Sequence, residues 1–144
     1  MSSGPRRPGL LAPNVQLRLV AALVEHHARQ LRWRHGLSCH VCLPRPRSRG
    51  TLALASADPL AAPRIDPGFL QGSEDVRELI EGYKLTRDLM HPPSMKAVWT
   101  KEFWSAGGEG DDAIEALLRR RVDTVYHPAG ICRMESTTAR SSIR

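Results

Sequence analysis

The chain has 144 residues, of which 41% are hydrophobic and 25% charged, so it can form one globular domain with its own core. No apolar run approaches the roughly 20 residues that cross a bilayer, which predicts no membrane span. The apolar stretch after the basic N-terminus stops at Pro13 and is too short for a signal peptide. We therefore expect a soluble, cytoplasmic protein.

The formal net charge of +6 raises the question of a nucleic-acid partner. The arginines are scattered over several expected elements, and no zinc-finger, helix-turn-helix or aromatic RNA-binding signature accompanies them. Arginine also greatly outnumbers lysine, which a GC-rich genome explains without any partner. We predict no nucleic-acid partner, and a basic interaction protein with salt-dependent binding is the weaker alternative.

The first part of the chain predicts a loose segment, a strand and a polar connection. Residues 1–13 are rich in Pro, Gly and Arg, and we expect a disordered lead-in. Residues 15–20 alternate apolar and polar side chains, which is typical of a half-buried strand. In the polar connection over residues 25–37, the adjacent His26 and His27 cannot share one face, so we expect solvated side chains and no metal site.

Residues 38–43 predict a second strand, which ends at Pro44. It contains the C-x-x-C pair Cys39 and Cys42, a spacing found in redox motifs and metal half-sites. On a strand these two thiols point to opposite faces, and only Cys132 is left to complete a zinc site. We predict structural cysteines and no metal.

Two more extended pieces and a helix follow. Residues 51–56 and 63–65 are separated by proline-containing turns, a pattern typical of an antiparallel sheet. Ser73 is the expected N-cap of a helix near 73–90, with acidic residues in its first turn. Its apolar stripe, which we expect to face the core, comprises Val76, Leu79, Ile80 and Tyr83, and later Leu89 and Met90.

An irregular segment, residues 94–110, precedes a second helix. Its aromatic residues either line a substrate entrance or anchor the loop locally, and they are Trp99, Phe103 and Trp104. Asp111 and Asp112 cap the helix over 111–121, whose last turn carries arginines that complement the helix dipole. The prediction is an α+β fold, an antiparallel sheet from residues 15–65 with both helices packed on one face.

A single histidine motif follows this helix. Residues 125–134 read Val-Tyr-His-Pro-Ala-Gly-Ile-Cys-Arg-Met, and the Pro and Gly after His127 hold it at the end of an element. The segment resembles the C-terminal histidine motif of the glucose–methanol–choline (GMC) oxidoreductases, Tyr-His-Pro-x-Gly-Thr-Cys-Arg-Met-Gly. Ile131 stands in place of the usual Thr, and Glu135 in place of the final Gly.

The resemblance extends over most of the chain. Residues 46–50, 54–59 and 62–70 are similar to the substrate-domain segment of GMC proteins, and the choline dehydrogenase-like branch is the most similar. We assign residues 14–134 to an incomplete GMC substrate domain, and residues 135–144 to a polar tail that resembles nothing in the family. The fold so implied is GMC substrate-domain-like and incomplete.

The resemblance implies an FAD-dependent flavoprotein that oxidises a small alcohol of the choline type. In this family the motif histidine faces the flavin and takes the hydroxyl proton or stabilises the alkoxide, and we assign that catalytic role to His127 alone. Cys132 and Arg133 are expected to pack or to form hydrogen bonds. The sequence has no Gly-x-Gly-x-x-Gly, so the FAD-binding unit is missing and a separate FAD-binding chain is the partner implied.

The missing glycine motif and the unrelated tail suggest a truncated or frame-shifted gene product. The alternative to a partial enzyme is a catalytically inactive fragment or binding module that keeps the fold without binding FAD. In either case we expect an exposed apolar face and, as a consequence, self-association.

Overall fold

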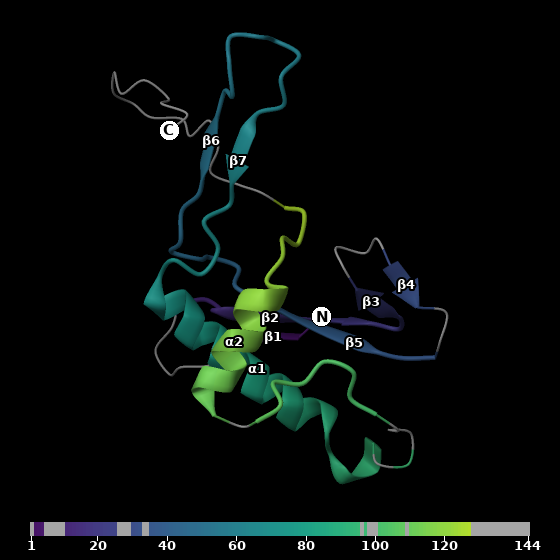
Figure 1. Ribbon diagram of the computed structural model, residues 1–144. Coiled ribbons are helices and arrows are strands. Elements are labelled where there is room, and N and C mark those ends of the chain that lie inside the picture. Colours follow the sequence, from purple (N-terminus) through teal and green to yellow (C-terminus); the bar gives the residue numbers. More distant parts are fainter. Residues whose placement is uncertain are drawn as a thin grey trace.

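A computed structural model describes most of the chain (Figure 1), namely residues 2–4, 11–25, 30–32, 35–95, 97, 101–108 and 110–127. The strands in this part are β1 (Ser2–Gly4), β2 (Val15–Val20), β3 (Leu23–Glu25), β4 (Gln30–Arg32), β5 (Ser38–Cys42), β6 (Thr51–Ala53) and β7 (Arg64–Asp66). The helices are α1 (Ser73–Met90), the short 3₁₀ turn Pro93–Met95 and α2 (Asp111–Arg121). The α+β class predicted from the sequence is confirmed. Within the described ranges, no helix is long and apolar enough to span a bilayer.

The strands form three small antiparallel sheets. The largest has the order β1-β2-β5, with β3-β4 and β6-β7 as separate two-stranded ribbons. In the largest sheet, Leu17 lies opposite Val41 and Gly4 lies opposite Val15. β1 thus lies within residues 1–13, the segment that we expected to be a disordered lead-in.

The β3–β4 ribbon was not predicted, because the sequence analysis took residues 25–37 as a polar connection. Leu23 on β3 is only 3% exposed, and Gly36 gives it room, since a Cβ on Gly36 would lie 2.4 Å from Cγ of Leu23. The Ser38 hydroxyl donates to Ala22 O at 2.7 Å and accepts from the Val24 amide at 3.1 Å. Main-chain pairing needs no apolar pattern, so a polar stretch can form a strand when a neighbour supplies the partner. His26 and His27 lie outside the described residues.

α1 lies against β2 and β5, and α2 packs against α1 (Figure 1). The contact between α1 and the sheet is close at Gly82, where a Cβ would lie 2.7 Å from Cγ1 of Val41. The two helices and the segment before α1 bury one apolar cluster, composed of Leu70, Val76, Ile80 and Ile114. The predicted stripe on α1 is therefore confirmed as core-facing from Val76 to Tyr83, whereas Leu89 near the end of the helix is 56% exposed.

The predicted helix caps were wrong by one residue. Gly72 and Gly110 are the N-caps, with extended backbone and no side-chain cap hydrogen bond, while Ser73 and Asp111 are the first helical residues. At α1 the amide of Gly72 donates instead to the hydroxyl of Ser48, at 3.0 Å. A group distant in the sequence thus takes the place of the expected local cap.

The β6–β7 hairpin projects away from the helices (Figure 1). Its strands are shorter than the predicted ones, with Leu52 opposite Ile65. The turn between them is held by local bonds such as the one from the Leu60 amide to Oδ1 of Asp58, at 2.9 Å. Three of its apolar side chains are largely exposed, namely Leu54, Leu60 and Ile65.

Candidate functional site

His127 lies six residues beyond the end of α2 on a segment that is held by short-range bonds. The Val122 amide ends the helix by donating to Leu118 O at 2.7 Å, and the Tyr126 amide donates to Oγ1 of Thr124 at 3.0 Å. Tyr126 has a φ of 61°, a left-handed conformation that is uncommon for a residue with a large side chain. His127 is exposed, so its imidazole is accessible to a ligand or a docking domain.

The structure describes only the first part of the histidine motif. Residues 128–134 lie outside the described residues, and with them Cys132 and Arg133. His127 is the only catalytic residue that we predicted from the sequence. There is therefore no second predicted residue whose distance from it could be examined. In the ranges that are described, no group of three or more His, Cys, Asp or Glu side chains could hold a metal ion.

The described residues do not fit the pyrophosphate of FAD. Such a group binds at a glycine-rich turn between a strand and the N-terminus of a helix. At the start of α1, the carboxylate of Asp75 already accepts hydrogen bonds from the loop before β6. The first turn of α2 carries Asp111 and Asp112, whose charges repel a phosphate. Neither helix start among the described residues therefore offers a site for a pyrophosphate.

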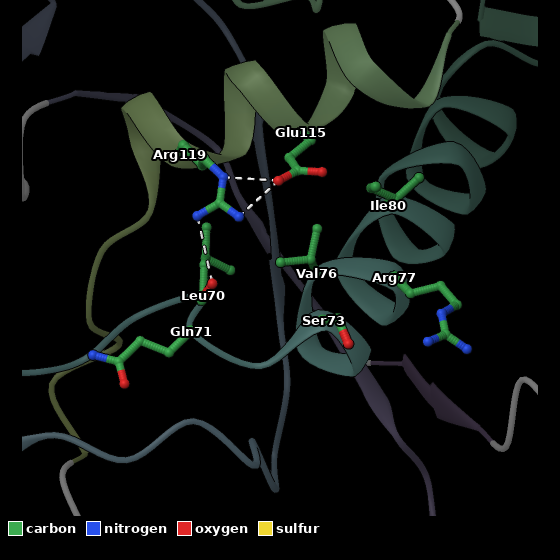
Figure 2. Close-up of a pocket in the computed structure, with 8 residues that line it drawn as sticks. All are labelled: Leu70, Gln71, Ser73, Val76, Arg77, Ile80, Glu115 and Arg119. Atoms are coloured by element: carbon green, nitrogen blue, oxygen red, sulfur yellow. Dashed lines mark hydrogen bonds and ion pairs between the residues drawn. The ribbon is translucent and has the colours of Figure 1, made fainter.

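A shallow hollow lies between the two helices and the segment before α1 (Figure 2). Its volume is about 280 Å³, and its lining comprises Leu70, Gln71, Ser73, Val76, Arg77, Ile80, Glu115 and Arg119. Figure 2 shows Arg119 reaching across it: Nε donates to Oε1 of Glu115 at 2.8 Å, and a terminal nitrogen donates to Leu70 O at 3.4 Å. Arg119 is thus already bonded within the protein, and His127 is not part of the lining of the hollow. The hollow is therefore a feature of helix packing.

Asp75 has a structural role that we did not predict from the sequence. Asp75 is only 4% exposed. Its carboxylate accepts hydrogen bonds from the amides of Arg47 and Ser48, at 2.8 and 2.7 Å. The Ser48 hydroxyl donates to the same carboxylate at 2.5 Å. Burial favours the neutral acid, but these hydrogen bonds outweigh it and hold the pKa of Asp75 below the usual value of 3.8. Asp75 thus fastens the loop before β6 to the first turn of α1.

The aromatic segment is held by contacts with both helices. Phe103 and Trp104 have ring centroids 6.2 Å apart, and the guanidinium of Arg121 lies 4.9 Å from the Trp104 centroid. The Ala106 amide donates to the hydroxyl of Tyr83 at 3.1 Å. Such contacts are those of a local anchor, the second of the two roles that the sequence left open. Trp99 lies outside the described part.

Cys39 and Cys42 are free, half-buried thiols. Cys39 lies opposite Leu19 and forms a hydrogen bond with Thr86 of α1, whereas Cys42 lies opposite Gln16 on the other face. Burial raises the pKa of both thiols, so they stay protonated and weakly reactive near neutral pH. The predicted placement on opposite faces is confirmed.

Comparison with known proteins agrees with the resemblance carried by the histidine motif. Residues 46–143 match the family model described as GMC oxidoreductase, which represents the C-terminal domain. A Pseudomonas putida protein named alcohol dehydrogenase (acceptor) is 36% identical over 135 residues, which cover 93% of this chain and 24% of the relative. Proteins named oxygen-dependent choline dehydrogenase from Photobacterium profundum and Rhizobium johnstonii are each 30% identical, covering 90% and 88% of this chain.

The chain spans about a quarter of the length of these relatives. The matched region contains the Pro46–Gly50 loop that binds Asp75, both helices and the histidine motif. The three-stranded sheet β1-β2-β5 precedes this region in the chain. With this match over residues 46–143, the chain belongs to the GMC oxidoreductase family, in the region of its C-terminal domain.

Proposed function

We propose that this chain supplies the substrate-binding part of an FAD-dependent oxidoreductase that oxidises the CH–OH group of a small alcohol. His127 takes the hydroxyl proton of the bound alcohol at a ring nitrogen, or stabilises the alkoxide. The hydride acceptor, FAD by family, is held by a separate FAD-binding unit, because the described residues do not fit its pyrophosphate.

The observation that carries this proposal is the family match over residues 46–143, which includes His127. Imidazole changes charge near neutral pH, which suits a base that must accept a proton and release it again. The exposure of His127 supports the proposal as well, since a base on this chain must meet a substrate beside a second domain. The names of the relatives, alcohol and choline dehydrogenase, favour a small alcohol as the substrate class.

A second candidate is a catalytically inactive fragment or binding module that keeps the fold and binds no FAD. The misfit at the starts of α1 and α2 favours it, because both sites carry carboxylates where a phosphate would have to bind. Under this alternative, His127 no longer meets a flavin.

Flavin content tests whether the chain on its own can hold FAD, which neither candidate expects. The chain is expressed, purified without added cofactor, and examined by visible absorption after gel filtration. We expect a colourless protein, and bound flavin would contradict the proposed need for a separate FAD-binding unit.

The role of His127 is tested in a chimera. This chain replaces the matching quarter of the Pseudomonas putida relative, whose remaining part supplies the rest of the protein. We expect alcohol-dependent dye reduction that falls about 100- to 10,000-fold in His127→Ala. His35→Ala, which removes another exposed imidazole, is the matched control and should change the rate little. A folded, flavin-containing chimera that is inactive with His127 intact would favour the binding module.

A further inference from the structure

The three-stranded sheet has one face that α1 covers. A Cβ on Gly82 would lie 2.7 Å from Cγ1 of Val41 and 3.2 Å from Cγ1 of Val15, so these two valines point toward the helix. Cys39, two residues before Val41, also meets α1 through its hydrogen bond with Thr86. Because side chains alternate along a strand, the residues between these positions point to the other face.

The other face is polar, and we call it the Arg18 face. Strand register pairs Arg18 with His40 and Gln16 with Cys42, which brings four polar side chains together on β2 and β5. Cys42 Sγ lies 3.5 Å from Gln16 O and from Gln16 Oε1, so the thiol has hydrogen-bond partners within this face. The cluster contains one permanent cation and no carboxylate.

Arg18 is the member of this face whose hydrogen-bonding needs are unmet. Its Nε is buried and has no hydrogen-bond partner. The ion pairs formed among the described residues involve other cations, namely Arg47, Lys84, Arg87 and Arg119. A buried N–H without an acceptor costs about 1–3 kcal/mol, and more when the group is charged. Arg18 is therefore a cation that no carboxylate of the described residues neutralises.

The neighbours of Arg18 do not supply a negative charge. Burial and the positive charge of Arg18 lower the pKa of His40, so this imidazole is neutral near neutral pH. Burial likewise raises the pKa of Cys42 and keeps its thiol protonated. The face thus carries a net positive charge beside groups that can donate or accept hydrogen bonds.

We propose that the Arg18 face binds the oxyanion group of a small ligand, a carboxylate or a phosphate, through the guanidinium of Arg18 with His40 beside it. The planar guanidinium presents paired N–H donors that match two oxygens of either group. The site needs neither FAD nor His127, so it stands or falls independently of the proposed redox role.

The test is a titration of the whole chain, labelled with ¹⁵N, with sodium acetate and in parallel with inorganic phosphate. Ionic strength is kept constant with sodium chloride, and the Nε–H resonance of Arg18 and the ring resonances of His40 are followed. We expect saturable shifts of both side chains. Saturation with acetate alone identifies a carboxylate site, saturation with phosphate alone a phosphate site, and saturation with both a general oxyanion site. Shifts with neither anion overturn the proposal.

Two variants separate local binding from a general effect of charge. Arg18→Met should weaken binding about tenfold or more, which corresponds to about 1.4 kcal/mol. Arg64→Met removes the same charge from the exposed strand β7 and should leave the affinity within about twofold. Equal weakening in both variants overturns the proposal.

A measurement on the unaltered chain keeps the test valid if Arg18→Met does not fold. A bound anion stabilises the imidazolium form and offsets the charge of Arg18, so the saturating anion should raise the pKa of His40. If the pH titration of His40 is unchanged in the presence of the anion that saturates the site, the proposal is overturned.

Discussion

The body of the fold and the β6–β7 hairpin differ in what covers their apolar side chains. In the body, α1 and α2 enclose a cluster whose most buried member is Ile114, 2% exposed. In the hairpin the large apolar residues face solvent, with exposures of 85% for Leu54, 92% for Leu60 and 68% for Ile65. The same residue types stabilise the body through packing and leave the hairpin without a core.

The hairpin takes its shape from backbone pairing and turn bonds. An isolated two-stranded hairpin is marginally stable in water, so its attachment to the body matters. That attachment includes the loop residues that Asp75 of α1 binds. At the base of the hairpin itself the two chain segments are close, since a Cβ on Gly50 would lie 2.2 Å from Asp66 O. The molecule thus has a packed body, an exposed hairpin and, between them, a joint formed by Asp75 and the loop that it binds.

The largest expected effect comes from the same substitution made in both regions. Ile114→Ala removes a fully buried side chain and should lower the free energy of unfolding by about 2–5 kcal/mol. Ile65→Ala removes an exposed one and should change it by about 0.5 kcal/mol or less. Urea unfolding followed by far-UV circular dichroism measures both. Equal losses would show that the hairpin is as well packed as the body.

The joint is tested through Asp75. Asp75→Ala leaves the amides of Arg47 and Ser48 without their acceptor and should cost about 2–3 kcal/mol, as expected for hydrogen bonds to a charged group. Urea unfolding near neutral pH gives the value. Asp112→Ala, an exposed acid on α2, is the matched control and should cost far less.

The same carboxylate predicts a dependence of stability on pH. The pKa of Asp75 is lower in the folded chain than its ordinary value of 3.8, so its contribution is fully present above that value. The contribution is lost as the pH falls through the lowered pKa of the folded state. Unfolding measured over this acid range should therefore show a steeper loss of stability in the unaltered chain than in Asp75→Ala. If the unaltered chain and Asp75→Ala lose stability equally as the pH falls, Asp75 does not cause the pH dependence.

A smaller effect is expected where α1 meets the sheet. Gly82→Ala improves helix propensity by about 1 kcal/mol but places a Cβ 2.7 Å from Val41, so we expect a net loss of about 1–2 kcal/mol. In Gly108→Ala the nearest atom to the new Cβ is that of Ala113, at 3.7 Å, an ordinary contact. A stabilised Gly82→Ala variant would show that the sheet can move away from α1 at little cost.

Local signals account for the parts of the fold that the sequence predicted. Helices α1 and α2 have a marked apolar stripe and clear stop signals, β2 alternates apolar and polar residues, and β5 ends before Pro44. Their positions therefore follow from nearby residues. The β3–β4 ribbon and the Gly72 cap were missed because each depends on a group distant in sequence, Ser38 and Ser48 respectively. The same reason applies to the sites. His127 sits in a contiguous motif, whereas Asp75 and the Arg18 face depend on partners that folding brings together.

The smallest effect on stability, and the one that bears most on the hairpin, is expected from its exposed leucines. Leu54→Ser combined with Leu60→Ser removes apolar surface that nothing described in the chain covers, so the free energy of unfolding should change by about 0.5 kcal/mol or less. If these side chains drive self-association, the substitutions should lower the apparent mass in light scattering at high protein concentration. Lys101→Ser, an exposed change outside the hairpin, is the control. An unaltered chain that is monomeric throughout would show that exposed leucines alone do not cause association.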